Sequence, residues 1–454
     1  MSRSHTTSGG NLATLLAEAA ADAPGRPALL HDGQRIVYAE LDTLAARAAG
    51  ALRDRGVRPG DRVALALPNR PDFVAAYHGA LRLGAIVVPI NPLLSEREQH
   101  ERIADADARV VVSGPLDGAP VDGVAGITGD DVAVVLYSSG TTGSPKRIEL
   151  THAGLRLNAE YVAYDALQLH KDDVLFGSAP LAHVFAMTGC MNAALAARAC
   201  LALVERFEPH AALDLIEHGH VTVFMGVPAM CVALLATGRS APLRLAHIGG
   251  APLAVETLHA FEERFGTTVL EGYGMTEVGG MATSNHAGRE RKPGTVGTPA
   301  AGGQVRIESN GTGEVLLLSP TIMRGHDGWL ATGDVGYLDD DGYLHLVDRK
   351  KDVILRGGYS VYPREIEEVL FAHPHVYEAV VLGVPDERLG EEVVALVVPA
   401  DPACDPVELQ AYARERVAAY AYPRRVVLVD DFPRSATGKI LRREIDREAL
   451  RTHS

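Results

Sequence analysis

Residues 137–146, YSSGTTGSPK, are a polar segment whose backbone and side chains could bind an anion. Two glycines, five serine or threonine hydroxyls and one lysine follow directly after the apolar run 132–136. Glycines let backbone amides turn toward a phosphate, and hydroxyl and ammonium groups can donate further hydrogen bonds to it. The segment lacks the GK[ST] ending of the common nucleotide-binding loop, and the alternation of residues 147–151 indicates a strand directly after it. It is therefore either a phosphate-binding loop between two strands or a solvated hairpin tip.

Four further motifs lie downstream in the chain. They are GYGMTE at 272–277, WLATGD at 329–334, DRKKDVILRGG at 348–358 followed by YPREIE at 362–367, and PRSATGK at 433–439. In type and order, these motifs and the polar loop resemble the adenylate-forming (AMP-binding) superfamily, in particular its acyl-CoA synthetase and fatty-acid–CoA ligase branch. The superfamily also includes the adenylation domains of peptide synthetases and the firefly-type luciferases. The resemblance spans roughly residues 12–450.

The resemblance implies an ATP-dependent carboxylic acid:CoA ligase that works in two half-reactions. The substrate carboxylate attacks the α-phosphate of ATP, pyrophosphate leaves, and the acyl group of the acyl-AMP is then transferred to the thiol of coenzyme A. The implied cofactors are ATP, Mg²⁺ and coenzyme A. Two unit charges about 4 Å apart repel by ~4 kcal/mol at an effective dielectric near ~20, so the first half-reaction needs positive countercharge between its reactants.

Four residues take catalytic roles under this resemblance. Lys439 bridges the substrate carboxylate and the α-phosphate, whereas in an isolated TGK it would be a surface lysine at the start of a helix. Glu277 holds Mg²⁺, which prefers carboxylate and phosphate oxygens, and Thr276 contacts phosphate. His183 closes the carboxylate side of the acyl pocket, and the alternative for this residue is a satisfied core histidine.

The resemblance also implies which residues surround the nucleotide and the thiol. Tyr273 stacks on adenine, Asp334 binds both ribose hydroxyls with its two acceptor oxygens, and Arg349 contacts ribose or phosphate. The full expected set is Ser138, Ser139, Gly140, Thr141, Thr142, Gly143, Lys146, Gly250, Ala251, Gly272, Tyr273, Gly274, Met275, Asp334 and Arg349 for the nucleotide, and Gly357 and Gly358 for the pantetheine tunnel. Glycines suit the tunnel wall because a side chain would block it.

Mostly apolar residues are expected to line the acyl pocket. They are Phe185, Met187, Met225, Val227, His247, Gly249 and Met281. Amino-acid-activating members of the superfamily place an aspartate near this segment to pair with the substrate amine, whereas Ala186, Met187 and Thr188 stand here. The sequence therefore favours an uncharged acyl or aryl acid over an amino acid.

Two features depart from the family pattern. Arg147 replaces the small glycine that usually follows the loop lysine, and the stretch 323–329 is shorter than usual. We expect a trimmed surface loop with intact catalysis, in which the shortened stretch could alter the acyl channel.

The elements that position these motifs belong to an α/β fold. Alternating helix and strand patterns over 12–113, and again after residue 151, predict βαβ units with parallel or mixed sheets. Short strands separated by Gly and Asp turns over 293–348 predict a small β-rich subdomain. Local signals also predict a helix after a capping box at Ser95 to Glu98, and helices that begin at Pro363 and extend over 409–420.

The motifs divide the chain into two domains. We expect an N-terminal AMP- and acyl-binding domain over 1–348, a hinge at 349–352 that includes Lys351, and a small mobile α+β C-terminal domain over 353–454 that carries Lys439. By resemblance, the C-terminal domain rotates about Lys351 so that Lys439 leaves the site before the thiol enters.

Charge and composition exclude some functions and leave others open. A formal net charge of -15 argues against a nucleic-acid partner, so the arginines at 424–425 and 442–443 are interpreted as solvated helix faces or small-anion contacts. Four scattered cysteines, no apolar leader and no convincing membrane span favour a cytoplasmic location. The expected partners are a carboxylic acid and either CoA or a carrier protein, and no oligomeric state is favoured. The alternatives are an acyl-AMP ligase that loads carrier-protein phosphopantetheine, a non-catalytic adenylate-binding protein and a luciferase-type oxidation.

Overall fold

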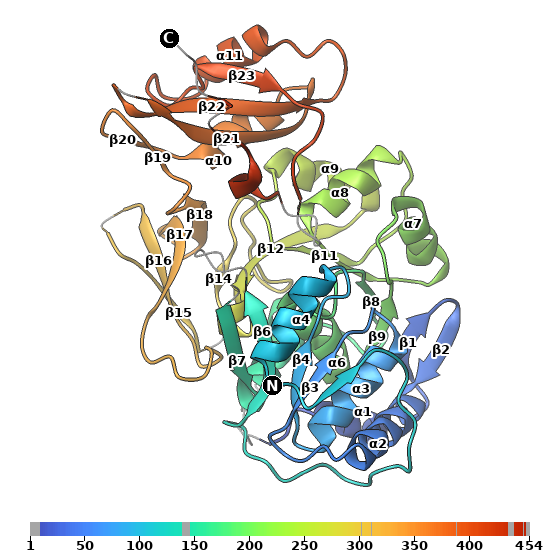
Figure 1. Ribbon diagram of the computed structural model, residues 1–454. Helices are drawn as coiled ribbons and strands as arrows, with labels where there is room; N and C mark the ends of the chain where they lie inside the picture. The colour runs from blue at the N-terminus through green and yellow to red at the C-terminus, as the bar shows by residue number, and fades with distance from the viewer. Residues whose placement is uncertain are drawn as a thin grey trace. The chain divides into compact units, whose positions relative to one another are not determined.

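The computed structural model describes residues 10–138, 146–300, 302–309, 311–386, 388–434, 440–447 and 449–450. The chain forms two compact units. Figure 1 colours the chain by residue number, from blue at the N-terminus to red at the C-terminus. The first contains Met1–Leu253, Thr257–Gln304 and Leu318–Gly328, and the second contains Ala254–Glu256, Val305–Leu317 and Trp329–Ser454. The expected hinge at 349–352 lies within the second unit, and its role as a hinge stays a prediction.

A nine-stranded sheet in the order β14-β13-β12-β11-β10-β8-β9-β1-β2 forms the centre of the first unit. Its strands are β1 (Pro27–His31), β2 (Gln34–Val37), β8 (Val174–Gly177), β9 (Cys200–Leu203), β10 (Val223–Gly226), β11 (Leu245–Ile248), β12 (Thr268–Met275), β13 (Gly280–Ser284) and β14 (Thr298–Pro299). Strands β9, β8, β10, β11 and β12 pair in parallel, as the βαβ pattern predicts, and β13 pairs antiparallel with β12. The carboxyl ends of β10, β11 and β12 therefore lie at one edge of the sheet.

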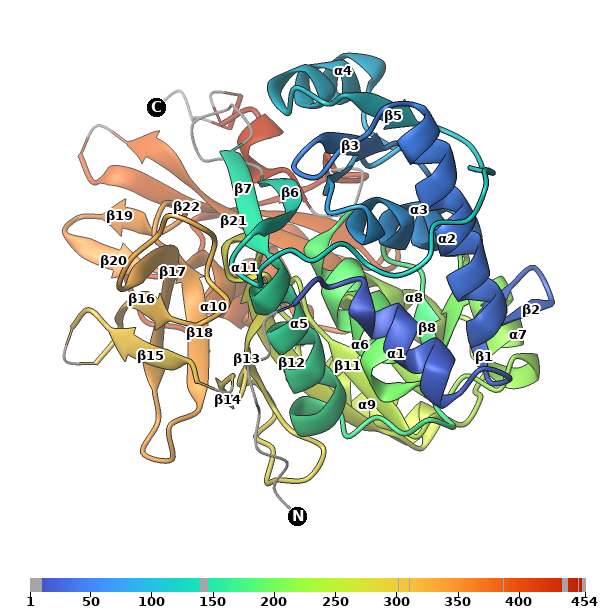
Figure 2. The same ribbon diagram turned by 90° about the horizontal axis from the view of Figure 1, so that it is seen from below.

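The parallel strands of this sheet carry apolar side chains on both faces. Both faces must therefore be buried, and helices cover them (Figure 2). On one face, Phe224 and Ile248 pack with Phe261 and other residues of α7 (Pro209–His218), α8 (Pro228–Ala236) and α9 (Val255–Phe265). On the other face, Met225 belongs to a cluster with α1 (Thr14–Asp22), α5 (His152–Glu160), α6 (Ala193–Ala197) and the π-helices Tyr161–Ala166 and Phe185–Asn192.

A five-stranded sheet in the order β5-β3-β4-β6-β7 completes the first unit. It contains β3 (Arg62–Leu65), β4 (Ile86–Pro89), β5 (Val110–Val112), β6 (Val132–Ser138) and β7 (Lys146–Thr151), with α2 (Tyr38–Asp54), α3 (Pro71–Arg82) and α4 (Glu96–Asp105) beside it. The predicted capping box at the start of α4 is confirmed, since the Glu98 amide donates to Ser95 Oγ at 3.3 Å and the Ser95 amide donates to Glu98 Oε2 at 3.0 Å. β6 and β7 pair antiparallel, which confirms that the predicted anion loop joins two strands.

Two sheets form most of the second unit. The first, β15-β16-β17-β18, contains β15 (Gln304–Ile307), β16 (Gly313–Leu318), β17 (Leu330–Leu338) and β18 (Leu344–Arg349). The second contains β19 (Ile354–Arg356), β20 (Tyr359–Val361), β21 (Val376–Asp386), β22 (Gly390–Pro399) and β23 (Arg425–Leu428), with α10 (Pro363–Phe371) and α11 (Pro406–Arg414). α10 begins at Pro363 as predicted, but the predicted helix over 409–420 ends at Arg414. After it, the Ala421 amide donates to the Ala418 carbonyl at 2.8 Å in a turn that redirects the chain toward β23.

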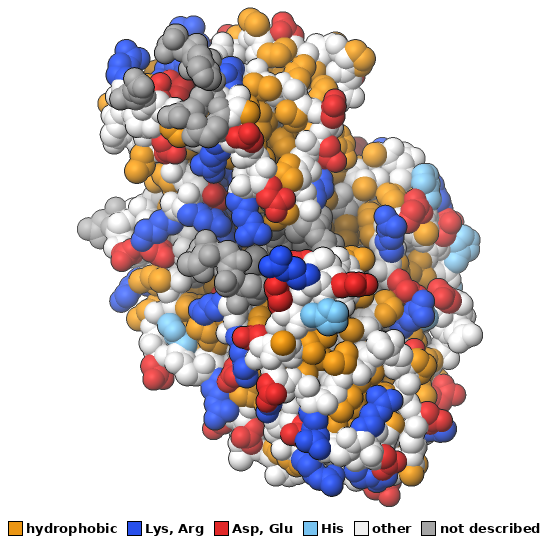
Figure 3. Space-filling model, viewed as in Figure 1, with side chains coloured by type: hydrophobic (Ala, Val, Ile, Leu, Met, Phe, Trp, Pro, Cys, Tyr) orange, Lys and Arg blue, Asp and Glu red, His pale blue; other side chains and the backbone are white. Residues whose placement is uncertain are grey.

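Two features concern the helices and the distribution of surface charge. Among the described residues, every helix is too short or too polar to traverse a lipid bilayer. Acidic and basic side chains are interspersed over the face of the molecule shown in Figure 3.

Candidate active site

The predicted phosphate loop begins and ends on paired strand residues. Ser138, the last residue of β6, pairs in register with Lys146, the first residue of β7, and the Lys146 side chain is exposed. Ser138 Oγ forms a long hydrogen bond of 3.5 Å to Glu277 Oε1. Residues 139–145 lie outside the described part of the chain, so the predicted positions Ser139, Gly140, Thr141, Thr142 and Gly143 are not placed. The structure thus brings the predicted magnesium ligand next to the start of the loop.

The GYGMTE motif runs from the end of β12 into a tight 3₁₀ turn, Thr276–Val278. The Met323 amide donates to the Glu277 carbonyl at 2.7 Å, and the Thr321 hydroxyl donates to the Val278 carbonyl at 2.7 Å. These bonds anchor the turn to Thr321 and to Met323, the first residue of the shortened stretch 323–329. Thr276 and Glu277 are half-buried, so both remain reachable for a ligand.

Gly274 lies against the neighbouring strand with no room for a side chain. A Cβ atom at this position would lie 2.0 Å from the Gly280 carbonyl oxygen. A bulge separates Tyr273 from Gly274 in the pairing of β12 with β13. The glycine therefore serves the close approach of two strands, and Tyr273 stands half-buried beside it.

The sequence HIGGA at the end of β11 lies beside β12 at the same edge of the sheet. The Gly249 amide donates to the Gly226 carbonyl at 3.2 Å. A Cβ at Gly249 would lie 3.1 Å from the Gly272 oxygen and 3.4 Å from the Phe185 ring. Gly250 adopts φ +78 and is exposed, and a Cβ there would lie 3.6 Å from Val227. Residues predicted for the nucleotide and for the acid therefore meet at this edge.

Several of the predicted acyl-pocket residues are clustered in the first unit. The rings of Phe185 and His247 stack with centroids 6.2 Å apart and an interplanar angle of 23°. Met187, Met225 and Met281 are buried in the same apolar cluster. Burial lowers the pKa of His247 to about 4. This wall combines adaptable methionines with a neutral imidazole.

His183 lies exposed beside this wall. The Phe185 amide donates to His183 Nδ1 at 3.3 Å, and the His183 amide donates to the Pro180 carbonyl at 2.9 Å. Its exposure excludes the alternative of a buried core histidine.

The second unit brings together Asp334 and Arg349. They pair in register on β17 and β18, and Arg349 Nε lies 2.8 Å from Asp334 Oδ1. The Asp334 side chain is 9% exposed, whereas the Arg349 side chain is 45% exposed. The Asp334 amide donates to Thr332 Oγ1 at 3.0 Å, within the TGD motif. The arginine orients the carboxylate and the motif fixes the backbone of Asp334, an arrangement that suits the binding of paired hydroxyls.

The other predicted residues of the second unit lie in turns. Lys351 is exposed in the turn after β18, which is closed by the Asp352 amide donating to the Arg349 carbonyl at 2.8 Å. Gly357 and Gly358 form the β19–β20 hairpin with φ +58 and +86, angles that favour glycine. Lys439 lies outside the described residues.

One structural ion pair was missed from the sequence. Arg442 Nη2 donates to both carboxylate oxygens of Glu367, at 2.7 and 2.6 Å, and Arg442 Nη1 donates to the Val381 carbonyl at 3.1 Å. The interpretation of Arg442 as part of a solvated helix face or a small-anion contact is therefore wrong. Its partner lies 75 residues earlier, so only the buried helix position of Glu367 could have indicated the pair.

The replacement of glycine by Arg147 has a local structural role. Arg147 Nη2 donates to Glu149 Oε1 at 2.9 Å, and its Nη1 lies 3.5 Å from the Asp105 carbonyl oxygen. The added charge is thus directed toward Glu149 and the end of α4.

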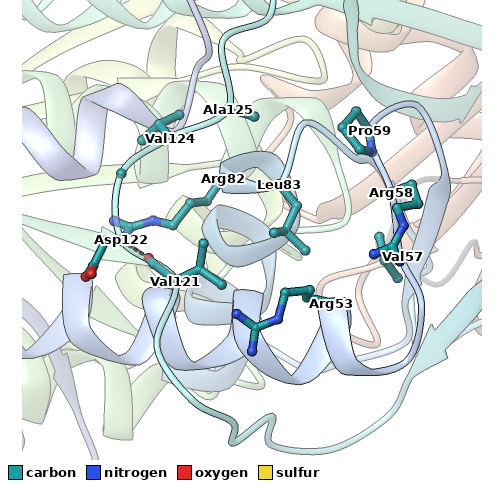
Figure 4. Close-up of a pocket in the computed structure, with 11 residues that line it drawn as sticks. Arg53, Val57, Arg58, Pro59, Arg82, Leu83, Val121, Asp122, Val124 and Ala125 are labelled. Carbon is teal, nitrogen blue, oxygen red and sulfur yellow. Dashed lines mark hydrogen bonds between the residues drawn. The ribbon is translucent and has the colours of Figure 1, made fainter.

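A separate hollow of about 380 Å³ lies between α2, α3 and the segment 121–125 (Figure 4). Within it, Arg82 is buried, pairs with Asp42 and donates to the Val121 carbonyl at 3.3 Å. The residues that line this hollow include none of the residues predicted for the active site. Its arginine already serves as a structural link between two helices and a loop.

Comparison with known proteins identifies two matching family models. The model of the AMP-binding enzyme matches residues 16–128 and 119–326, and that of the AMP-binding enzyme C-terminal domain matches residues 365–439. The chain is 32% identical to the long-chain-fatty-acid–CoA ligase of Bacillus subtilis, with 97% of this chain and 95% of that protein covered. It is 35% identical to a feruloyl-CoA synthase of Amycolatopsis sp, with 93% and 96% covered.

Solved structures of similar fold bind nucleotides. The o-succinylbenzoate coenzyme A synthetase of Bacillus subtilis in complex with ATP and magnesium superposes with a TM-score of 0.85 at 28% identity, with 96% of this chain and 99% of that chain covered.

Proposed function

The chain belongs to the AMP-binding enzyme family and is an ATP-dependent acid:CoA ligase, and we propose that its substrate is a carboxylic acid with an uncharged acyl or aryl tail. The observation that carries the assignment of the site is the contact of Glu277 with Ser138 at the start of the predicted phosphate loop. A carboxylate beside a phosphate loop supplies the ligand type that Mg²⁺ prefers. When bound there, Mg²⁺ would neutralise phosphate charge.

In the first half-reaction, the acid attacks the α-phosphate and pyrophosphate leaves. Lys439 supplies the cation between the two anions, and Thr276 and Lys146 bind phosphate oxygens. Asp334, oriented by Arg349, accepts hydrogen bonds from the ribose hydroxyls, and this is supported by their 2.8 Å ion pair. These residues orient the acid toward the phosphorus atom so that the attack is effectively unimolecular.

In the second half-reaction, the thiol attacks the acyl carbon of the acyl-AMP and AMP leaves. We assign the adenylation role to a domain over 1–348, the hinge to 349–352 with Lys351, and the mobile lobe to 353–454. Rotation about Lys351 would remove Lys439 and bring the hairpin of Gly357 and Gly358 to the thiol path. The positive φ angles of these glycines support a backbone wall without side chains.

The acyl wall supports an uncharged tail. Its buried members are methionines and a neutral histidine, and Thr188 stands where a charged partner for an amine would be expected. A carrier-protein phosphopantetheine remains the alternative acceptor to CoA. The cytoplasmic location also stays a prediction.

The test is a pyrophosphate-release screen over short, medium, long-chain and aryl acids, followed by both half-reactions of Lys439→Ala. We expect this variant to lose acyl-AMP formation and to keep thioester formation from supplied acyl-AMP. Lys171→Ala, an exposed lysine in the first unit, is the control and should retain both. An equal loss of both half-reactions in a folded Lys439→Ala protein would contradict the role of Lys439.

Failure of every acid in the screen to convert ATP to AMP would contradict the ligase function itself. Assays with CoA and with a holo-carrier protein as acceptors distinguish the two thiol partners. If thioester formation is faster with the holo-carrier protein than with CoA, the carrier protein is the thiol acceptor.

A further inference from the structure

The two strands that lead into and out of the predicted phosphate loop carry different side chains on their two faces. Tyr137 of β6 pairs in register with Arg147 of β7, and Ser138 pairs with Lys146; these four residues form the stem of the loop. Successive residues of a strand point to opposite faces, and directly opposed residues point to the same face. Tyr137 and Arg147 therefore share one face of the stem, and Ser138 and Lys146 share the other.

Tyr137 joins its face of the stem to α4. The Tyr137 hydroxyl donates to Oδ2 of Asp105, the last residue of α4, at 2.6 Å, and it lies 3.2 Å from the Arg102 carbonyl oxygen. The Arg102 guanidinium lies 6.0 Å from the centre of the Tyr137 ring, within the range of a cation–π contact. Ile103 of α4 and the Tyr137 ring also pack against the same apolar cluster. One side chain thus links β6 to the last turn of the helix.

The phenol of Tyr137 acts as a donor at neutral pH. Burial, followed by the hydrogen bond to Asp105 and the charge of its carboxylate, raises the pKa of Tyr137 above its usual value. The hydroxyl therefore keeps its proton. Its bond to the Asp105 carboxylate is charge-assisted, which makes it stronger than a bond between two neutral groups.

Arg147 forms a second, weaker link from the same face of the stem. Its Nη1 lies 3.5 Å from the Asp105 carbonyl oxygen, which is a long hydrogen bond, and its Nη2 donates to Glu149 Oε1 at 2.9 Å. The side chains of Arg147 and Glu149 are 38% and 35% exposed, so water weakens their ion pair. Both strands of the stem therefore reach Asp105, the stronger link coming from Tyr137.

The opposite face of the stem carries the groups that are proposed to meet phosphate. Ser138 Oγ lies 3.5 Å from Oε1 of Glu277, the proposed ligand of Mg²⁺, and the side chain of Lys146 is exposed. A strand rises by only about 3.3 Å per residue. A displacement of Tyr137 or Arg147 would therefore move Ser138 or Lys146 with it.

Building on the proposed ligase function, we propose that Tyr137 and Arg147 are positioning residues that fix the stem to α4 and thereby hold its phosphate-facing side chains in place for the triphosphate of ATP. They act through their strand neighbours, because their own side chains lie on the other face. The triphosphate depends on this position because Lys146 and the proposed Mg²⁺ site supply positive charge to it. AMP has one phosphate group and depends on the stem less.

The experiment measures the dissociation constants of Mg·ATP and of AMP directly, so it needs no acid substrate. Isothermal titration calorimetry gives both constants for the wild type, Tyr137→Phe and Arg147→Gly. Tyr164→Phe is one matched control, because it also removes a tyrosine hydroxyl that donates a hydrogen bond, here to the Ala196 carbonyl. Arg35→Gly is the other, because it also replaces an exposed strand arginine by glycine, in β2. Thermal unfolding shows that each variant is folded.

We expect Tyr137→Phe to raise the Kd for Mg·ATP by about 10-fold, the size of one lost hydrogen bond to a charged group, and the Kd for AMP by less than about 2-fold. Arg147→Gly should raise the Kd for Mg·ATP by about 3-fold, the range of a surface ion pair. Both controls should leave both constants unchanged. A purely structural role of the stem contacts would instead lower the thermal stability and leave the ratio of the two constants unchanged.

Three results would overturn the proposal. They are an unchanged Kd for Mg·ATP in Tyr137→Phe or Arg147→Gly, an equal weakening of Mg·ATP and AMP, and the same change in a control variant. If Arg147→Gly does not fold, the nearly isosteric Tyr137→Phe decides the question. A wild type that binds Mg·ATP, with variants that leave the ratio unaffected, refutes only the role of the stem contacts. A wild type that binds neither nucleotide refutes the ligase function as well.

Discussion

Replacement of Arg442 by methionine should weaken the second unit by leaving the carboxylate of Glu367 buried without its cation. Arg442 donates to both oxygens of Glu367, whose Oε1 also accepts a hydrogen bond of 2.6 Å from the Val381 amide. The side chain of Glu367 is 9% exposed, and that of Arg442 is 25% exposed. The pair joins α10 to the segment that follows Lys439 in the sequence.

The expected loss is about 3 kcal/mol in the free energy of unfolding of this unit. Removing one partner of a buried ion pair costs about 3–5 kcal/mol, and the partial exposure of Arg442 lets water reach the remaining carboxylate, which favours the lower value. The double variant Glu367→Gln/Arg442→Met removes the charge and keeps an acceptor for the Val381 amide. It should therefore be more stable than Arg442→Met alone, with a coupling energy of about 2 kcal/mol.

The loss should depend on pH in one direction. Burial raises the pKa of Glu367 above its usual value, although Arg442 opposes this shift. In Arg442→Met the pKa of Glu367 should rise further, so the folded protein takes up a proton that the unfolded chain releases. Protonation then favours the folded state, and the deficit relative to the wild type should shrink as the pH falls from about 7.5 to about 5.

Urea unfolding followed by tryptophan fluorescence measures this effect directly. Trp329 is the single tryptophan of the chain and belongs to the second unit, where the Arg306 guanidinium lies 4.5 Å from the centre of its ring. The exposed neighbour Arg443→Met is the matched control and should change stability by less than about 0.5 kcal/mol. A loss in Arg442→Met as small as the control, or one that does not change with pH, would refute this reasoning.

Three other perturbations have defined outcomes. Asp334→Asn should raise the KM for ATP by about 10-fold or more, because it removes the charge that pairs with Arg349 and that we propose to accept hydrogen bonds from the ribose hydroxyls. Initial rates against ATP measure this, with the exposed Asp340→Asn as the control. Gly274→Ala should lose both activity and stability, because its Cβ would lie 2.0 Å from the Gly280 oxygen. Gly114→Ala is the control and should lose neither, because no atom lies within 4 Å of its Cβ position. Thermal unfolding measures the stability of both variants, and pyrophosphate release measures their activity. Burial lowers the pKa of His78, His152 and His247 to about 3, 4 and 4, below the value of 6.5 in the unfolded chain. The unfolded chain therefore binds protons more readily than the folded protein, and the free energy of unfolding should decrease as the pH falls below 6.5. Below pH 6.5, each of these histidines should add about 1.4 kcal/mol per pH unit to the slope of the unfolding free energy against pH. His78→Leu should therefore flatten this slope. An unchanged slope would mean that His78 is protonated in the folded protein.

Local signals in the sequence predicted the elements well where one short pattern decides the structure. The capping box at Ser95 and the proline at 363 place the starts of two helices correctly. The polar loop after an apolar run was correctly predicted to join two strands. The helix over 409–420 was predicted too long because tertiary requirements end it at Arg414, where the chain turns toward β23.

Contacts between distant segments could not be derived from these signals. Ser138 and Glu277 are 139 residues apart, and only their roles in a familiar set of motifs suggested that they would meet. Arg442 looked like a solvated charge because nothing near it in the sequence marks Glu367 as its partner. His247 was expected in the acyl wall, but its surroundings depend on Met225, Leu270 and Phe185 from three separate elements.

Strand β12 constrains how acid preference can change in this protein. It carries Gly272 beside the His247 imidazole, Tyr273 in the predicted adenine position and Glu277 just past its end, all within six residues. A one-residue insertion before Gly272 would move the following residues of β12 to the opposite face of the sheet and would displace the positions proposed for both reactants. New acid preferences should therefore arise by substitution in β10, β11 and the π-helix Phe185–Asn192, while the length of β12 stays fixed.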